Sequence, residues 1–331
     1  MQVEELFEPR VLIVSGKGGV GKTTVAAALA LVAARQGRTV CIAEVDRKGT
    51  LPRLFDSGAL GYAPREMSPG VWGMNIVPEP ALAEYLEVQY HMRRISRIFS
   101  SSHFVDYITT AAPGLKDILV LGKIWYLEQN RQGVPGQPRF DTIIVDAPAA
   151  GHMLTFLSAP VGLSDAIRVG PVRKQAEWLL DMVTDPQRTR VHLVTLAEEM
   201  PVSETLETAE ALRTRVGIAA GVVFANAVYE PLLTTPERKQ LIDLVATGDF
   251  GPLVTEGKTV GLDFDASDLE ALVGYARFLE ARRAIQGSHL KSLKKGLDEP
   301  VAHLPFLFSA GLALPDIETI ADAIEERVEP L

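Results

Sequence analysis

The feature that most constrains the fold is a short apolar run that stops abruptly at a glycine-rich loop. Residues 10–15 (RVLIVS) are apolar and β-branched, and residues 16–24 (GKGGVGKTT) follow at once. Residues 22–36 then form a strongly apolar segment that ends at Gly37. A run of strand length, a glycine loop and a helix stopped by glycine together predict one strand–loop–helix unit.

The loop matches the phosphate-binding pattern G-x-x-x-x-G-K-[ST] in its required context, after a strand and before a helix. Its glycines let backbone N–H groups turn inward around phosphates, and the helix N-terminus adds a positive dipole end. We expect Lys22 to bridge the β- and γ-phosphates of ATP, Thr23 to ligate Mg²⁺ and Thr24 to reach the α-phosphate. The predicted nucleotide contacts in the loop are Gly16, Gly18, Gly19, Val20, Gly21, Lys22, Thr23 and Thr24.

Further apolar runs of strand length alternate with helical segments along the chain. Strands that alternate with helices predict βαβ units and a doubly wound, mostly parallel α/β sheet. We interpret residues 1–331 as one domain, interrupted at 81–129 by an all-helical insertion. The remaining runs are strands at 39–45, 142–145, 190–195, 219–225 and 304–307, and helices at 267–297 and 315–326.

Composition excludes several classes of protein. The net charge of −9 and the pI of about 5.3 argue against a protein that coats nucleic acid. Cys41 is the single cysteine, so the chain has neither an internal disulfide nor a cysteine metal cluster, which is typical of a reducing compartment. The longest apolar stretch, 25–34, is shorter than the roughly 18 residues that span a bilayer. We therefore expect a cytoplasmic protein without stable membrane insertion.

Two carboxylates follow predicted strands at the sheet edge where ligands bind in open α/β folds. Asp46 follows the second strand and is placed to orient an attacking water and to contact the Mg²⁺ shell. Asp146 follows residues 143–145 (IIV), and we expect it to end that strand and to hold Mg²⁺, partly through water. Together with the loop, these residues complete a predicted Mg-ATP site.

Lys17 adds information about assembly. A second lysine directly after the first glycine is not needed to hold a nucleotide within one chain, and it resembles the deviant Walker A class of P-loop ATPases. In that class two subunits face each other across the nucleotides, and this lysine reaches into the partner's site. The resemblance implies a catalytic role for Lys17 and a homodimer, or a heterodimer with a paralogue.

Longer motifs resemble the ArsA family, which includes arsenite-pump ATPases and ATPases that deliver tail-anchored membrane proteins. They stand at 113–117 (PGLKD), 146–152 (DAPAAGH), 194–205 (VTLAEEMPVSET), 221–226 (GVVFAN) and 304–307 (LPFL). The resemblance implies that Asp46 belongs to the first nucleotide-sensing switch and that 146–152 is the second. It also implies nucleotide contacts by Gly151, Asn226, Pro305 and Phe306, and a protein or membrane-related client.

The sequence departs from this family in two places, and alternatives follow. The first switch contains Arg47 and Lys48 instead of the usual proline and alanine, which favours a looser loop. The lack of paired cysteines argues against a metalloid or zinc role. The stripe formed by Tyr85, Val88, Met92, Ile95 and Phe99 is interpreted as core packing rather than a client groove. The alternatives are a positioning ATPase of the MinD or ParA type, or a nucleotide-gated scaffold with negligible turnover.

Overall fold

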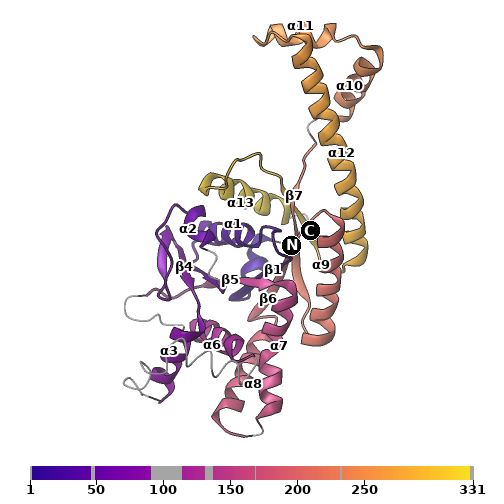
Figure 1. The fold of residues 1–331 in the computed structure, drawn as a ribbon. Coiled ribbons are helices and arrows are strands. Elements are labelled where there is room, and N and C mark those ends of the chain that lie inside the picture. Colours follow the sequence, from indigo (N-terminus) through magenta and orange to yellow (C-terminus); the bar gives the residue numbers. More distant parts are fainter. Residues whose placement is uncertain are drawn as a thin grey trace.

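The computed structural model describes residues 2–45, 49–90, 114–130, 137–167, 169–231 and 233–328. Its centre is an eight-stranded sheet in the order β3-β4-β2-β5-β1-β6-β7-β8 (Figure 1). β3 runs antiparallel to β4, and the other neighbouring strands are parallel. The strands are β1 (Val11–Gly16), β2 (Val40–Glu44), β3 (Arg65–Ser68), β4 (Val71–Asn75), β5 (Thr142–Ala149), β6 (Thr189–Leu196), β7 (Ala220–Val228) and β8 (Val301–Pro305).

Helices connect most of these strands. In the described part of the chain they are α1 (Lys22–Arg35), α2 (Thr50–Leu54), α3 (Pro78–Tyr90), α6 (Leu115–Gln129), α7 (Ala150–Ala166), α8 (Pro171–Thr184), α9 (Glu199–Ala211), α10 (Thr235–Thr247), α11 (Gly251–Thr259), α12 (Ala266–Gly296) and α13 (Leu314–Val328), with short turns η1 (Val3–Phe7) and η2 (Leu212–Val216). Among the described residues, no helix is both long enough and apolar enough to cross a bilayer.

Helices cover both faces of the sheet because both sets of alternating side chains in its central strands are apolar. In β1, Leu12 and Val14 belong to a core cluster shared with α1 and α13. Val11 and Ile13 belong to a second cluster on the opposite face, which includes residues of α6, α7 and α8. α1 is apolar on nearly every side and is buried accordingly. The predicted doubly wound, mostly parallel α/β fold is therefore confirmed.

The structure corrects three predicted details of the sheet. The last strand was predicted at 304–307, but β8 begins three residues earlier because Val301 pairs with Val223 of β7. Asp146 was predicted to end its strand, but β5 continues to Ala149. The hairpin of β3 and β4 at the sheet edge was missed altogether.

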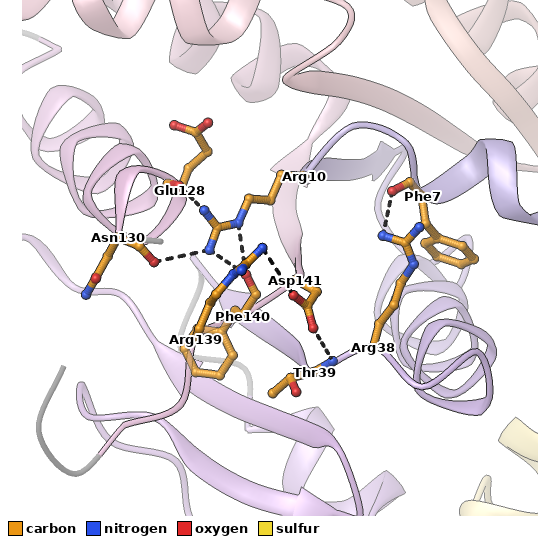
Figure 2. Close-up of polar contacts among 9 residues, drawn as sticks. All are labelled: Phe7, Arg10, Arg38, Thr39, Glu128, Asn130, Arg139, Phe140 and Asp141. Carbon is orange, nitrogen blue, oxygen red and sulfur yellow. Dashed lines mark hydrogen bonds and ion pairs between the residues drawn. The ribbon is translucent and has the colours of Figure 1, made fainter. Parts of the chain in front are cut away.

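Arg10 ties together three segments at the amino edge of the sheet (Figure 2). Its guanidinium donates to the backbone carbonyls of Phe140 at 2.9 Å, of Asn130 at 3.2 Å, and of Glu128. The Glu128 carboxylate is buried and pairs with Arg188 at 2.7 Å. These contacts fix the end of α6 to the start of β1, the strand that carries the glycine loop.

The predicted insertion at 81–129 falls partly outside the described residues. α3 and α6 occupy its two described ends, and the hydroxyl of Tyr85 on α3 donates to Gln175 of α8 at 2.6 Å. Met92, Ile95, Phe99 and the side chain of Val88 lie outside the described part. The insertion as a separate subdomain stays a prediction.

A helical projection extends away from the rest of the molecule (Figure 1). It contains α10, α11 and the first two-thirds of α12, and we call residues 235–285 the arm. The C-terminal part of α12 packs on α9 and β7. α12 has 31 residues, so it is about 46 Å long at 1.5 Å per residue. The sequence predicted most of α12, but nothing in it indicated that this helix leaves the body of the domain.

Candidate nucleotide site

The glycine loop lies at the carboxyl edge of the sheet, between the ends of β5 and β6, which flank β1. Gly16 is the last residue of β1, and a Cβ atom there would lie 2.0 Å from the carbonyl oxygen of Val194 in β6. Glycine is therefore required at this position by the close approach of two strands. The strands β5 and β6, on either side of β1, therefore hold the start of the loop in place.

Gly21 holds the other end of the loop. It is the N-cap of α1 with φ +94°, and an added Cβ would lie 2.3 Å from Nδ2 of Asn226. Between these two glycines Val20 is buried, whereas Gly18 and Gly19 are exposed, with nothing within 4 Å of an added Cβ. The loop is thus anchored at both ends and open in the middle, which leaves its backbone accessible to a phosphate chain.

Lys22 is buried and folds back over the loop. Its ammonium donates to the carbonyl oxygen of Lys17 at 2.9 Å. The N-cap of α1 is Gly21, so no side chain caps this helix and its N-terminus faces the loop. Thr24, also predicted to contact the nucleotide, is buried in that first turn. The arrangement places one cation beside a set of backbone donors, as binding of a polyphosphate requires.

Thr23 and Asp146 meet at the centre of the site. The Thr23 hydroxyl donates to Oδ2 of Asp146 at 2.6 Å, and Asp146 is buried within β5. Mg²⁺ prefers oxygen ligands in an octahedron of 2.0–2.1 Å bonds, in which adjacent ligands lie about 3 Å apart. These two oxygens fit such a cation, either directly or through water. Both residues were predicted as its ligands.

Lys17 makes a contact that sequence reasoning missed. Its ammonium pairs with the carboxylate of Glu204 in the same chain at 2.9 Å, and both side chains are about one-third exposed. Glu204 lies on α9, within the motif at 194–205. Only the fold brings these two residues together, because 187 positions separate them in the sequence.

The second predicted switch is connected to the loop and to α6. The hydroxyl of Ser15, one residue before the loop, donates to the carbonyl of Pro148 at 2.8 Å. Gly151 and His152 lie in the first turn of α7 rather than in a loop. Burial raises the pKa of the Asp117 carboxyl on α6, and nearby His152 lowers it. Residues 146–152 therefore contact the strand before the loop and interact electrostatically with α6.

The first predicted switch is only partly described. Asp46 lies outside the described residues, and so do Arg47 and Lys48. Glu44, two residues before Asp46, is buried at the end of β2 and accepts a weak hydrogen bond of 3.4 Å from the backbone N–H of Leu51. The carboxylate of Glu44 was not singled out from the sequence, where it reads as one more residue of a strand.

The residues predicted to contact adenine lie at the ends of β7 and β8. Asn226 donates from Nδ2 to the carbonyl of Val20 at 2.9 Å, so its side chain already contacts the loop. Pro305 ends β8, and Phe306 stacks on Tyr229 with ring centroids 4.5 Å apart. Tyr229 was missed because nothing in its local sequence distinguishes it. Asn226 joins β7 to the loop, and Pro305 and Phe306 lie beside Val228 at the end of the same strand.

Comparison with known proteins agrees with this geometry. Residues 9–182 match the model of the anion-transporting ATPase (ArsA) family. The chain is 38% identical to the ATPase BagA of Mycobacterium tuberculosis over 96% of its own length and 93% of the relative. It is 28% identical to an arsenical pump-driving ATPase of Acidiphilium multivorum over 66% of its own length, but it spans only 40% of that relative. The chain therefore belongs to the ArsA family of ATPases.

Proposed function

We propose that this ATPase binds Mg-ATP along residues 16–24 and hydrolyses its terminal phosphoanhydride bond there. The observation that carries this proposal is the contact of 2.6 Å between Thr23 and Asp146, next to buried Lys22. Mg²⁺ would be held by the Thr23 hydroxyl and the Asp146 carboxylate, and would supply positive charge to the β- and γ-phosphates. Lys22 would leave the carbonyl of Lys17 and bind the same phosphates.

Hydrolysis by this arrangement is direct attack of water on the γ-phosphate. Asp46 is assigned the orientation of that water, because β2 ends two residues before it in the sequence and its carboxyl end lies at the edge of the sheet where the loop lies. The backbone donors of the loop and the Lys22 ammonium stabilise the charge that develops on the transferred γ-phosphoryl group and on the departing ADP. Val20, Gly151, Asn226, Pro305 and Phe306 are assigned to binding and to the adenine side.

Lys17 would complete the site of a second subunit, either another copy or a paralogue. In the structure its ammonium is held by Glu204 of its own chain. An exposed pair of this kind contributes roughly 0–1 kcal/mol, so the phosphates of a facing subunit can displace Glu204 at little cost. The weakness of this ion pair implies two states. In the resting state Lys17 pairs with Glu204 of its own chain, and in the active state Lys17 reaches across the interface.

Nucleotide state would be transmitted through residues 146–157 towards α6. Support comes from the Ser15 contact with Pro148 on one side and from the charge interaction of His152 with Asp117 on the other. α3, α6, α7 and α8 surround an apolar cavity of about 190 Å³, where Trp125 and Trp178 stack 5.3 Å apart. A protein or membrane-related client is therefore proposed to bind near this end of the molecule.

Metalloid transport is not proposed, although some relatives are named for arsenical pumps. Cys41 is fully buried in β2, and burial raises the pKa of its thiol to about 12. A thiol in this state is a poor ligand, since the thiolate is the form that binds soft metals. One buried thiol does not make a metalloid site.

Steady-state ATP hydrolysis with and without Mg²⁺ tests the assignments. We expect Lys22→Ala and Asp46→Asn each to lower turnover by at least about 100-fold, and Lys17→Ala to lower it while leaving ATP binding intact. Lys295→Ala, an exposed lysine of α12, is the matched control and should keep full activity. Turnover that survives Lys22→Ala would remove the loop from the mechanism.

A further inference from the structure

The free face of α12 carries apolar side chains that the protein itself does not cover. Leu269, Val273 and Leu279 are buried on one side of the helix. On the other side Phe278 is 55% exposed and Ile285 is 53% exposed. Leu272 and Tyr275 are also exposed, at 47% and 44%, so four large apolar residues of α12 lie in the open. Apolar side chains gathered in the open on one helix mark a surface that binds something.

The exposed residues on this face follow a strict heptad spacing. They recur alternately at intervals of four and three, and every one of them is exposed: Ser267, Ala271, Gly274, Phe278, Ala281, Ile285, Ser288 and Ser292. Six of the eight are Ser, Ala or Gly, and Phe278 and Ile285 are the two large apolar members. A mean period of 3.5 residues over 26 positions keeps them along one side of the helix, where small residues allow a second helix to approach closely and the two large ones can fill the space. We call these eight residues the α12 seam.

The α12 seam is complementary to itself when two copies run antiparallel. In one such register the twofold axis passes between Leu279 and Glu280. Phe278 then lies opposite the partner's Ala281. In the same register Ile285 lies opposite the partner's Gly274. Large residues thus meet small ones, which is how closely packed helices interdigitate. Gly274 has room for this, because nothing lies within 4 Å of a Cβ atom added there.

The positions flanking the seam favour the same register. Glu270 lies opposite the partner's Lys291, and Asp268 lies opposite the partner's His289. Tyr275, whose ring packs edge-on against Phe308 of its own chain at 6.5 Å, lies opposite the partner's Arg282. In antiparallel coiled coils these flanking residues set orientation and partner choice. This register thus places Glu270 beside a lysine on one flank and Asp268 beside a histidine on the other.

A parallel pairing of the same helices is disfavoured. It would set Phe278 against the partner's Phe278 and leave Gly274 against the partner's Gly274. It would also bring Arg277 beside the partner's Arg282, a like-charge contact that costs energy. The sequence of α12 therefore distinguishes the two orientations, and it selects the antiparallel one.

The antiparallel register also limits the distance between the two nucleotide sites. Gln286 joins α12 to the carboxyl end of β7, since its amide donates to Ala227 at 2.9 Å and accepts from the N–H of Tyr229 at 2.8 Å. Asn226, the residue before Ala227 in β7, contacts the glycine loop. Gln286 and its copy would stand 13 residues apart along the paired helices, or about 20 Å at 1.5 Å per residue.

We propose that α12 pairs antiparallel with α12 of a second copy of this chain, and that this pair sets the spacing of the two nucleotide edges. The pairing itself depends only on α12. The statement that bound nucleotides are held at this spacing rests on the proposed function above. The arm is then the element that sets the distance across which Lys17 works.

Engineered cysteines test the register directly, because the native Cys41 is buried. Gly274→Cys combined with Ile285→Cys should give a covalent dimer on mild oxidation. The two cysteines of one chain are 11 residues apart, about 16 Å along the helix, which is beyond the reach of a disulfide. Neither single variant should cross-link, since each cysteine lies about 16 Å from its own copy. Cross-linking by the single variants, or none by the double variant, overturns the register.

Sedimentation equilibrium of the full chain tests the interface without a covalent trap. We expect a dimer whose dissociation constant rises about 100-fold in Phe278→Glu, because the charge enters the interface twice. Ile242→Glu is the matched control: it alters an apolar residue 59% exposed on α10, outside the seam, and should leave the constant unchanged. A wild-type chain that stays monomeric to about 100 µM with and without ATP overturns the proposal.

A third variant separates this proposal from the proposed function. Lys22→Ala should abolish turnover and still give the covalent dimer in the Gly274→Cys, Ile285→Cys background. Phe278→Glu should lose the dimer and still bind ATP, since residue 278 lies on the arm and outside the loop. Loss of ATP binding with the dimer intact refutes only the nucleotide assignments, and loss of the dimer pattern with ATP binding intact refutes only the pairing.

Discussion

Substituting Gly21 by alanine should strain the glycine loop in a way that a second substitution partly relieves. Gly21 has φ +94°, in the region that side chains with a Cβ avoid. The added methyl group would lie 2.3 Å from the amide nitrogen of Asn226. That amide donates to the carbonyl of Val20 at 2.9 Å, so Asn226 cannot move aside without losing this bond.

The expected cost follows from these two effects. A left-handed conformation costs alanine about 1–2 kcal/mol, and loss of the Asn226 hydrogen bond costs about 1 kcal/mol. Gly21→Ala should therefore lower the free energy of unfolding by about 2–3 kcal/mol. In an Asn226→Ala background the clash is gone, and the same substitution should cost only the conformational part, about 1–2 kcal/mol.

The wild type, Gly21→Ala, Asn226→Ala and the double variant form a double-mutant cycle. Urea unfolding followed by tryptophan fluorescence measures the stability of each of these four proteins. Gly162→Ala is a matched control, because Gly162 lies inside α7 with nothing within 4 Å of an added Cβ. It should be neutral or slightly stabilising. Strictly additive costs for Gly21→Ala and Asn226→Ala would refute the contact between these side chains, and a neutral Gly21→Ala would refute the loop conformation itself.

Three further predictions concern the body of the domain. Arg10→Gln removes a guanidinium that donates to three carbonyls and should destabilise the fold by about 2–4 kcal/mol in urea, whereas Arg190→Gln, which loses one exposed contact of 3.0 Å, should cost under about 1 kcal/mol. Burial lowers the pKa of His192 from 6.5 to about 4, so the unfolded chain binds a proton that the native state excludes. Stability should fall by about 2 kcal/mol between pH 7 and pH 5, and His192→Gln should remove that part of the pH dependence. Cys41 should react with iodoacetamide only after denaturation, because burial raises the pKa of its thiol to about 12.

The centre of the fold was predictable because local signals and burial agree there. β1, the glycine loop and α1 follow from a run of strand length, glycines at set positions and a helix that is apolar all round. The edge of the sheet lacked such signals. β3 is short and exposed, and β4 contains Trp72 and Gly73 in place of alternating β-branched residues.

The candidate site was predictable where one short motif holds its residues. Thr23, Lys22 and Gly21 stand next to one another in the sequence, and their neighbour Asp146 follows an apolar run that marks a strand. Glu204 and Tyr229 were missed because their partners are brought to them by the tertiary fold. The bounds of β8 were misjudged because its start, Val301, depends on pairing with β7 rather than on its own composition.

Calorimetric titration of ATP with and without Mg²⁺ is the sharpest test of whether Mg-ATP binds between the glycine loop and Asp146. We predict that Mg²⁺ tightens ATP binding in the wild-type chain by at least about tenfold, and that Asp146→Asn removes this gain while ATP alone still binds. ATP binding that is indifferent to Mg²⁺, or a gain that survives Asp146→Asn, would contradict this assignment of the site.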